Sequence, residues 1–76
     1  MKIIVLHNRF DNRPIIVRPD RISMIQSMED DGQFSNIVGQ YSNILIESFS
    51  IDVKESVREI MLKIINAERS DNNEKR

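Results

Sequence analysis

Cysteine is absent from this chain of 76 residues, and histidine occurs once, as His7. Without cysteine no disulfide can stabilise the fold, and a structural zinc site needs cysteine or several histidines as ligands. A chain of this length buries only about 60% of the surface that its unfolded form exposes. We therefore expect one domain that is stabilised by tight packing or by oligomerisation, without a metal or any other cofactor.

Long apolar runs are also missing. The opening run Lys2–Leu6 is shorter than the roughly 7–15 apolar residues of a secretory signal, and nothing approaches the ~18 residues of a membrane span. The net charge is -1 and aromatic residues make up 5%, which argues against general binding of nucleic acid or anionic lipid. We expect a cytoplasmic protein that has no membrane partner.

Motifs for catalysis or ligand binding are lacking as well. There is no nucleophile elbow and no phosphate-binding loop, so His7 has no catalytic neighbours in the sequence and is interpreted as a surface or strand-end residue. The acidic run Glu29–Gly32 lacks the alternating ligands and the distal glutamate of a calcium loop, and is interpreted as a solvated turn. We expect neither an enzyme nor a small-molecule substrate.

Short apolar and β-branched runs predict the strands. Residues 2–6 and 13–18 flank an Asn/Asp-rich loop and predict a hairpin, in which Pro14 begins a strand or lies on an edge. Residues 21–28 alternate and predict a third strand. The two sides of that strand would be Ile22, Met24, Gln26 and Met28, and Ser23, Ile25 and Ser27.

The second half of the predicted sheet is harder to divide. Residues 43–47 predict a strand, and residues 51–53 predict either its hairpin partner or the continuation of one bent strand. Residues 33–42 are compatible with a short strand or with an ordered loop.

The end of the chain predicts a capped amphipathic helix from Ser56 to about Arg69. Ser56 and Glu59 match the capping box, and apolar residues recur at the helical period. They are Val57, Ile60, Met61, Ile64 and Ile65. Residues 70–76 are polar and predict a flexible tail. The expected fold class is α+β: a small antiparallel sheet of four to five strands followed by one C-terminal amphipathic helix, in a single domain of residues 1–69.

With Leu62 and Ala67 included, the apolar residues of this helix span an arc of roughly 220° at 100° per residue, although a helix on one sheet needs little more than ~100°. Leu62 and Ile65 therefore lie on a flank that one small sheet does not need to cover. Either residues 33–42 cover this flank, or it contacts another chain. We favour an oligomer or partner contact at Leu62, Ile65 and Arg58, and hence a homo-oligomer or a protein partner.

The distribution of charge leaves a second possibility open. Residues 1–21 carry five basic and two acidic side chains, whereas residues 22–55 carry one basic and six acidic ones. This uneven charge is either self-complementary or simply solvated. The basic group could also contact nucleic-acid phosphates, with Phe10 stacking on a base. The arginines concerned are Arg9, Arg13, Arg18 and Arg21.

Two short motifs carry a resemblance to a known family. Pro19–Ile22 (Pro-Asp-Arg-Ile) is similar to an N-P-D-x-I motif, and Val53–Ser56 (Val-Lys-Glu-Ser) runs directly into the amphipathic helix. In these motifs, and in the order of elements over residues 1–68, the chain resembles the small flagellar and swarming motility proteins of the FlbD/SwrD type. The resemblance implies a non-enzymatic accessory protein and no catalytic residues.

The chain departs from that family pattern in two places. Residues 29–43 are longer than the compact N-G hairpin of the family, and Leu6–Phe10 stands where the family has L-N-G. The arrangement of strands before one terminal helix also resembles RNA-binding dimers of the carbon-storage-regulator type, in architecture only.

Overall fold

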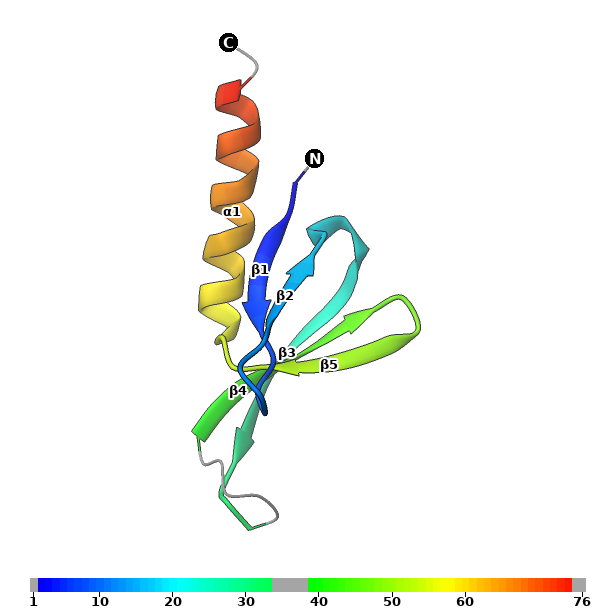
Figure 1. The fold of residues 1–76 in the computed structure, drawn as a ribbon, viewed down its shortest axis with the longest axis vertical. Helices are drawn as coiled ribbons and strands as arrows, with labels where there is room; N and C mark the ends of the chain where they lie inside the picture. Colours follow the sequence, from blue (N-terminus) through cyan, green and yellow to red (C-terminus); the bar gives the residue numbers. More distant parts are fainter. Residues whose placement is uncertain (1, 34–38, 75–76) are drawn as a thin grey trace.

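Two small antiparallel β-sheets and one long helix make up the fold (Figure 1). The structure is a computed structural model that describes residues 2–33 and 39–74, with helix side chains described as far as Arg69. The elements in chain order are β1 (Ile4–His7), β2 (Pro14–Val17), the 3₁₀ turn η1 (Pro19–Arg21), β3 (Ile22–Asp30), β4 (Gly39–Ile46), β5 (Phe49–Val53) and α1 (Val57–Glu74). The predicted α+β class is confirmed.

The strands divide into two sheets, although we expected one. β1 pairs with β2, and β3, β4 and β5 pair in that order in a second sheet. An isolated antiparallel bridge between Asn8 and Val53 joins the end of β1 to the end of β5. Beside this bridge, the Lys54 N–H donates to the His7 carbonyl at 3.0 Å. The two sheets therefore meet where the chain turns into α1.

The predicted first hairpin is confirmed as β1 and β2. The Asn8 side-chain oxygen accepts the N–H of Phe10 at 2.9 Å, an Asx turn that begins the connecting loop. Asn12 has a φ of 61°, a left-handed conformation that asparagine adopts more readily than most residues. Pro14 begins β2 on the edge of its sheet, as expected.

The third strand differs from the prediction in the residues that face the core. The pairing of β3 with β4 shifts by one residue between Ile22 and Met24. This bulge places Ile22 and Ile25 against the core, whereas Met24 and Met28 are exposed. The simple alternation, which put Ile22 on the same side as Met24, was therefore wrong because a β-bulge adds one residue to a strand.

The long β3–β4 hairpin accounts for part of the segment that the sequence left open. β4 begins at Gly39, so Tyr41 belongs to a strand that continues to Ile46. Residues 34–38 lie outside the described residues. β4 and β5 form a hairpin with a turn at Glu47 and Ser48, which decides between the two alternatives for residues 43–53.

α1 begins at the predicted capping box. The Ser56 hydroxyl accepts the N–H of Glu59 at 3.1 Å, and the Glu59 carboxylate accepts the N–H of Ser56 at 3.2 Å. The helix continues beyond the expected end at Arg69 to Glu74, through residues that include neither Gly nor Pro. Residues 70–74 of the expected tail are therefore helical, and residues 75–76 lie outside the described residues.

The hydrophobic core lies between α1 and the two sheets and is small. Among the described residues its buried apolar members are Ile4, Leu6, Val17, Ile44, Val53 and Ile60. Only Ile60 comes from the helix, and Ile64 and Ala67 pack beside it partly buried. The end of α1 extends past the sheets (Figure 1), so its last turns add little to this core.

Ser42 is a polar defect in this core. Its side chain is 0% exposed, and its hydroxyl has no hydrogen-bond partner in the described part of the chain. Burying an unpaired hydroxyl is unfavourable by about 1–3 kcal/mol. We expect Ser42→Ala to raise the free energy of unfolding by up to about 1 kcal/mol, measured by urea denaturation. Ser27→Ala, at the exposed partner position on β3, serves as the control; a loss of stability specific to Ser42→Ala would contradict this account.

Candidate interaction surfaces

One flank of α1 is apolar and exposed. Ile60 and Ile64 face the core, whereas Met61, Leu62 and Ile65 retain 45%, 50% and 41% of their exposure. Arg58 is exposed on the same flank. In Figure 1 the β3–β4 hairpin projects away from the helix, and the described residues of the 33–42 segment leave this flank open. The structure thus brings Leu62, Ile65 and Arg58 together at one exposed surface.

The four arginines of the N-terminal cluster do not form one patch. Arg13 and Arg18 lie beyond opposite ends of β2, and Arg21 ends η1. Each of the four pairs with a carboxylate, and three of these pairs are on the surface. They are Arg13–Asp11 at 3.8 Å, Arg18–Asp20 at 3.4 Å and Arg21–Glu47 at 3.0 Å. Such exposed pairs contribute little to stability. They lie apart on the surface, and in each of them a carboxylate offsets the charge of its arginine.

Arg9 has a structural environment that the sequence did not reveal. Its side chain is only 5% exposed and its guanidinium donates to the Asp30 carboxylate at 2.7 Å. The guanidinium carbon lies 3.7 Å from the centre of the Tyr41 ring and 5.2 Å from that of Phe10, which is cation–π geometry. Arg9 therefore ties the β1–β2 loop to the β3–β4 hairpin and is not presented for phosphate binding.

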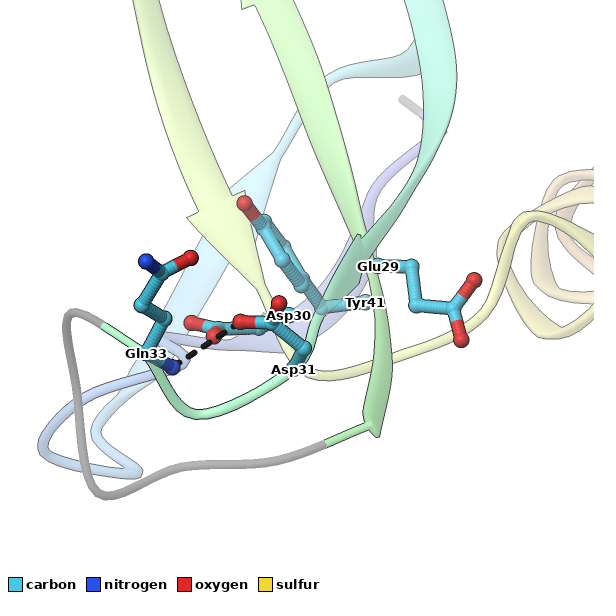
Figure 2. Close-up of a pocket in the computed structure, with 5 residues that line it drawn as sticks. All are labelled: Glu29, Asp30, Asp31, Gln33 and Tyr41. Carbon is cyan, nitrogen blue, oxygen red and sulfur yellow. Dashed lines mark hydrogen bonds between the residues drawn. The ribbon is translucent and has the colours of Figure 1, made fainter.

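An open acidic pocket lies beside this arginine. It has a volume of ≈ 490 Å³, and its lining residues are Glu29, Asp30, Asp31, Gln33 and Tyr41 (Figure 2). The Asp30 and Asp31 carboxylates accept the main-chain N–H groups of Gly32 and Gln33, at 2.8 and 2.9 Å. These Asx contacts shape the connection that follows β3. The expected turn at Glu29–Gly32 was wrong for Glu29 and Asp30, which are the last residues of β3 and pair with β4. Among residues 2–33 and 39–74, no three histidine, aspartate or glutamate side chains are placed so that together they could hold a metal ion.

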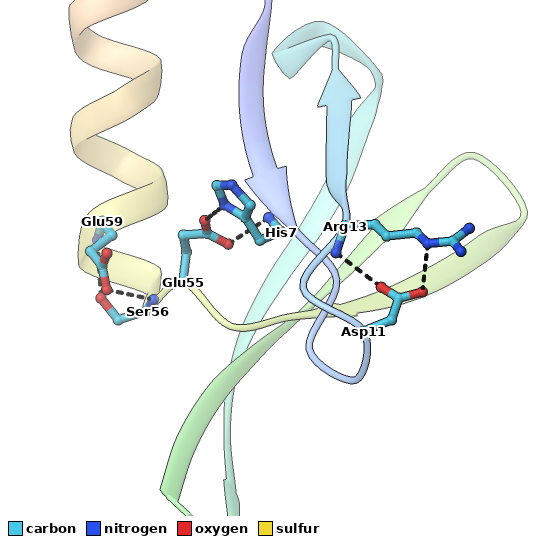
Figure 3. Close-up of polar contacts among 6 residues, drawn as sticks. All are labelled: His7, Asp11, Arg13, Glu55, Ser56 and Glu59. Carbon is cyan, nitrogen blue, oxygen red and sulfur yellow. Dashed lines mark hydrogen bonds and ion pairs between the residues drawn. The ribbon is translucent and has the colours of Figure 1, made fainter. Parts of the chain in front are cut away.

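His7 and Glu55 form a clamp between β1 and the start of α1 (Figure 3). One carboxylate oxygen of Glu55 accepts the His7 main-chain N–H at 2.9 Å, and the other lies 2.6 Å from His7 Nδ1. Burial, with the Glu55 side chain 5% exposed, raises the pKa of Glu55, but the hydrogen bonds from His7 outweigh burial and leave that pKa below its ordinary value of 4.5. His7 thus acts as a strand-end residue whose ring is committed to a structural carboxylate.

A groove runs between β1 and the flank of α1 that carries Lys63 and Asn66. It has a volume of ≈ 320 Å³ and is lined by Ile3, Ile4, Val5, Lys63, Asn66 and Ala67. Its walls are an apolar strand and a helix with one cationic and one amide side chain. No local pattern of residues predicts this groove, because its two walls are brought together only by the fold.

In the part of the chain that the structure describes, no helix is long and apolar enough to cross a lipid bilayer. Comparison of the chain with models of protein families, with curated proteins and with solved structures gave no significant match.

The clamp predicts a pH-dependent stability. Near neutral pH, Glu55→Gln should lower the free energy of unfolding by about 1–2 kcal/mol, because a charged acceptor is replaced by a neutral one. The folded state depresses the pKa of Glu55, so the wild-type advantage is complete above pH 4.5 and shrinks as the pH falls through the folded-state pKa. Urea denaturation across this range measures it. Glu29→Gln, at an exposed position, is the control, and a pH-independent difference for Glu55→Gln would refute the prediction.

The stacking of Arg9 on Tyr41 predicts that the planar guanidinium contributes more to stability than the positive charge alone. Arg9→Lys keeps the charge but removes the planar guanidinium, which stacks on the Tyr41 ring and donates to the Asp30 carboxylate. We expect this substitution to lower the free energy of unfolding by about 1–2 kcal/mol. Arg13→Lys, at an exposed position with a long ion pair, should stay within about 0.5 kcal/mol of the wild type. Equal effects of the two substitutions in thermal denaturation would contradict the structural role of Arg9.

Proposed function

We propose that this protein is a non-enzymatic accessory or regulatory protein of the cytoplasm that acts through protein–protein contacts and forms a homo-oligomer. The observation that supports this most is the exposed apolar flank of α1, at Met61, Leu62 and Ile65. Water contact with three large apolar side chains on one helix face is unfavourable. Because each is already about half-buried, covering the rest of it in an interface is worth roughly 1 kcal/mol. Arg58 beside them supplies a polar rim.

The surface area of the chain supports the same proposal. The chain exposes 5665 Å², whereas a compact monomer of 8.9 kDa exposes about 4800 Å² by the usual scaling with mass. Its radius of gyration is 13.6 Å, against about 11.4 Å for a compact domain of this length. The excess belongs to an elongated chain, with principal extents of 51 × 23 × 19 Å, that leaves more apolar surface in water than a compact domain does.

The family resemblance supports an accessory role, and the structure explains what its motifs do. Pro19–Arg21 forms the 3₁₀ turn before β3, and Ile22 follows against the core. In the second motif Glu55 binds His7 and Ser56 caps the helix. Both motifs are therefore structural, so a relation to the FlbD/SwrD type would bring the fold without bringing catalytic chemistry. We include that relation in the proposal.

The chemistry of the polar clusters also favours contacts over catalysis. His7 is held by Glu55, and the acidic pocket at Glu29–Asp31 has no serine, cysteine, lysine or histidine among the described residues of its lining. The four arginines are balanced by carboxylates at separate places on the surface. This arrangement adds no support to binding of nucleic acid, and we do not propose it.

The proposal predicts the mass of the protein in solution. Light scattering at micromolar concentration should give a mass that is a multiple of 8.9 kDa, and Leu62→Glu should lower that mass because it places a charge in the apolar contact. Ser48→Glu adds the same charge at the exposed β4–β5 turn and should leave the mass unchanged. A wild-type mass of 8.9 kDa, or an unchanged mass for Leu62→Glu, would contradict self-association through this flank.

A further inference from the structure

The strand β1 has the composition of a central strand but pairs along its full length on one side only. Its residues are Ile-Val-Leu-His with Ile3 before them, apolar on both faces. Strands that are apolar on both faces are usually covered on both faces and both edges. Within residues 2–33 and 39–74, β1 shares a strand ladder with β2, and its other edge is paired only at the His7 end, next to the Asn8–Val53 bridge. Ile3 and Val5 are exposed. An apolar strand edge that carries neither proline nor charge is a template for pairing with another chain.

The direction of the free hydrogen-bonding groups follows from His7. The N–H and carbonyl of His7 both point away from β2, since they bond to Glu55 and Lys54. Groups two residues apart in a strand point the same way. The N–H and carbonyl of Val5 therefore point to the same edge, and no hydrogen bond outside the strand ladders occupies them among the described residues. Ile3 precedes the strand and continues its line.

The edge of β1 that faces away from β2 is thus covered at His7 and open at Val5. At His7, the Glu55 carboxylate and the Lys54 N–H take the positions that a neighbouring strand would use. From Val5 towards the N-terminus no described residue takes these positions, and the groove of ≈ 320 Å³ lies beside them. On the other wall of the groove Lys63 is half-buried, and it forms no ion pair within the part of the chain that the structure describes.

We propose that this groove binds an extended, acidic segment of a partner protein, which adds a strand to the edge of β1 and places a carboxylate against Lys63. The main chain of the segment would bond to Ile3 and Val5, and its alternate side chains would enter the apolar part of the groove between β1 and Ala67. This inference rests on the proposed function only in that the protein acts through protein contacts. It uses the flank of α1 that carries Lys63, about 160° around the helix from Ile65.

The positive charge of Lys63 favours an acidic segment over a second copy of the chain in this groove. Two-fold pairing of two β1 edges would bring a second α1 with its own Lys63 to the same groove, and two like charges would meet there. A single extended strand brings no helix and can supply the anion that the half-buried Lys63 lacks. A carboxylate is therefore the chemical feature that we expect in the partner.

A displayed library of random ten-residue peptides, selected against the full chain, tests this proposal. We expect it to enrich peptides that combine β-branched residues with Asp or Glu. Lys63→Glu should weaken the selected peptides about tenfold or more, as loss of a charge-assisted contact does, and should itself select basic peptides. Val5→Pro removes an N–H that β2 does not use and should weaken binding similarly. Ser48→Glu is the control for added charge.

The outcomes are separable because circular dichroism establishes whether each variant is folded, and Lys63→Glu tests the groove even if Val5→Pro does not fold. No enrichment, or binding that Lys63→Glu leaves unchanged, would overturn the proposal. Protection of the Val5 amide that rises with protein concentration in the absence of peptide would assign the edge to a second copy and overturn it as well. Self-association through Leu62 is measured separately by light scattering, so failure of one proposal leaves the other testable.

Discussion

The bond between the Glu55 carboxylate and His7 holds the three parts of this molecule together. It joins the end of β1 to the residue before the helix cap, next to the Asn8–Val53 bridge that connects the two sheets. A buried carboxylate is unfavourable unless its oxygens are satisfied, and here His7 satisfies both with its main-chain N–H and its ring. The position of α1 over the core, and therefore the placement of both of its flanks, depends on this contact.

The small core explains why so much apolar surface remains. Two sheets of two and three strands and a single helix bury few large side chains completely, and no disulfide compensates for this. The result is an elongated molecule in which α1 is covered on its core side only. Its other flanks differ in chemistry: Leu62 and Ile65 are apolar, whereas Lys63 and Asn66 are polar and face the open edge of β1. The two proposed contacts therefore lie on different flanks of one helix.

Local patterns predicted most of the elements, and tertiary contacts account for the errors. The capping box at Ser56, the first hairpin and the exposed flank at Leu62 follow from spacing alone. The bulge in β3 and the separation into two sheets do not, because both depend on packing between distant residues. The clamp joins residues 48 positions apart, and the stacking of Arg9 on Tyr41 likewise crosses between hairpins. The turn at Glu47, where φ is 54°, contains no glycine or asparagine from which it could have been predicted.

Contact between copies at the exposed flank of α1 is the central claim, and it can be observed directly. A mixture of methyl-labelled and unlabelled protein allows nuclear Overhauser effects between different copies to be separated from those within one copy. The account predicts intermolecular effects at the Leu62 and Ile65 methyl groups, which are exposed in the single chain. Their absence at concentrations well above micromolar, with only intramolecular effects at these methyl groups, would contradict it.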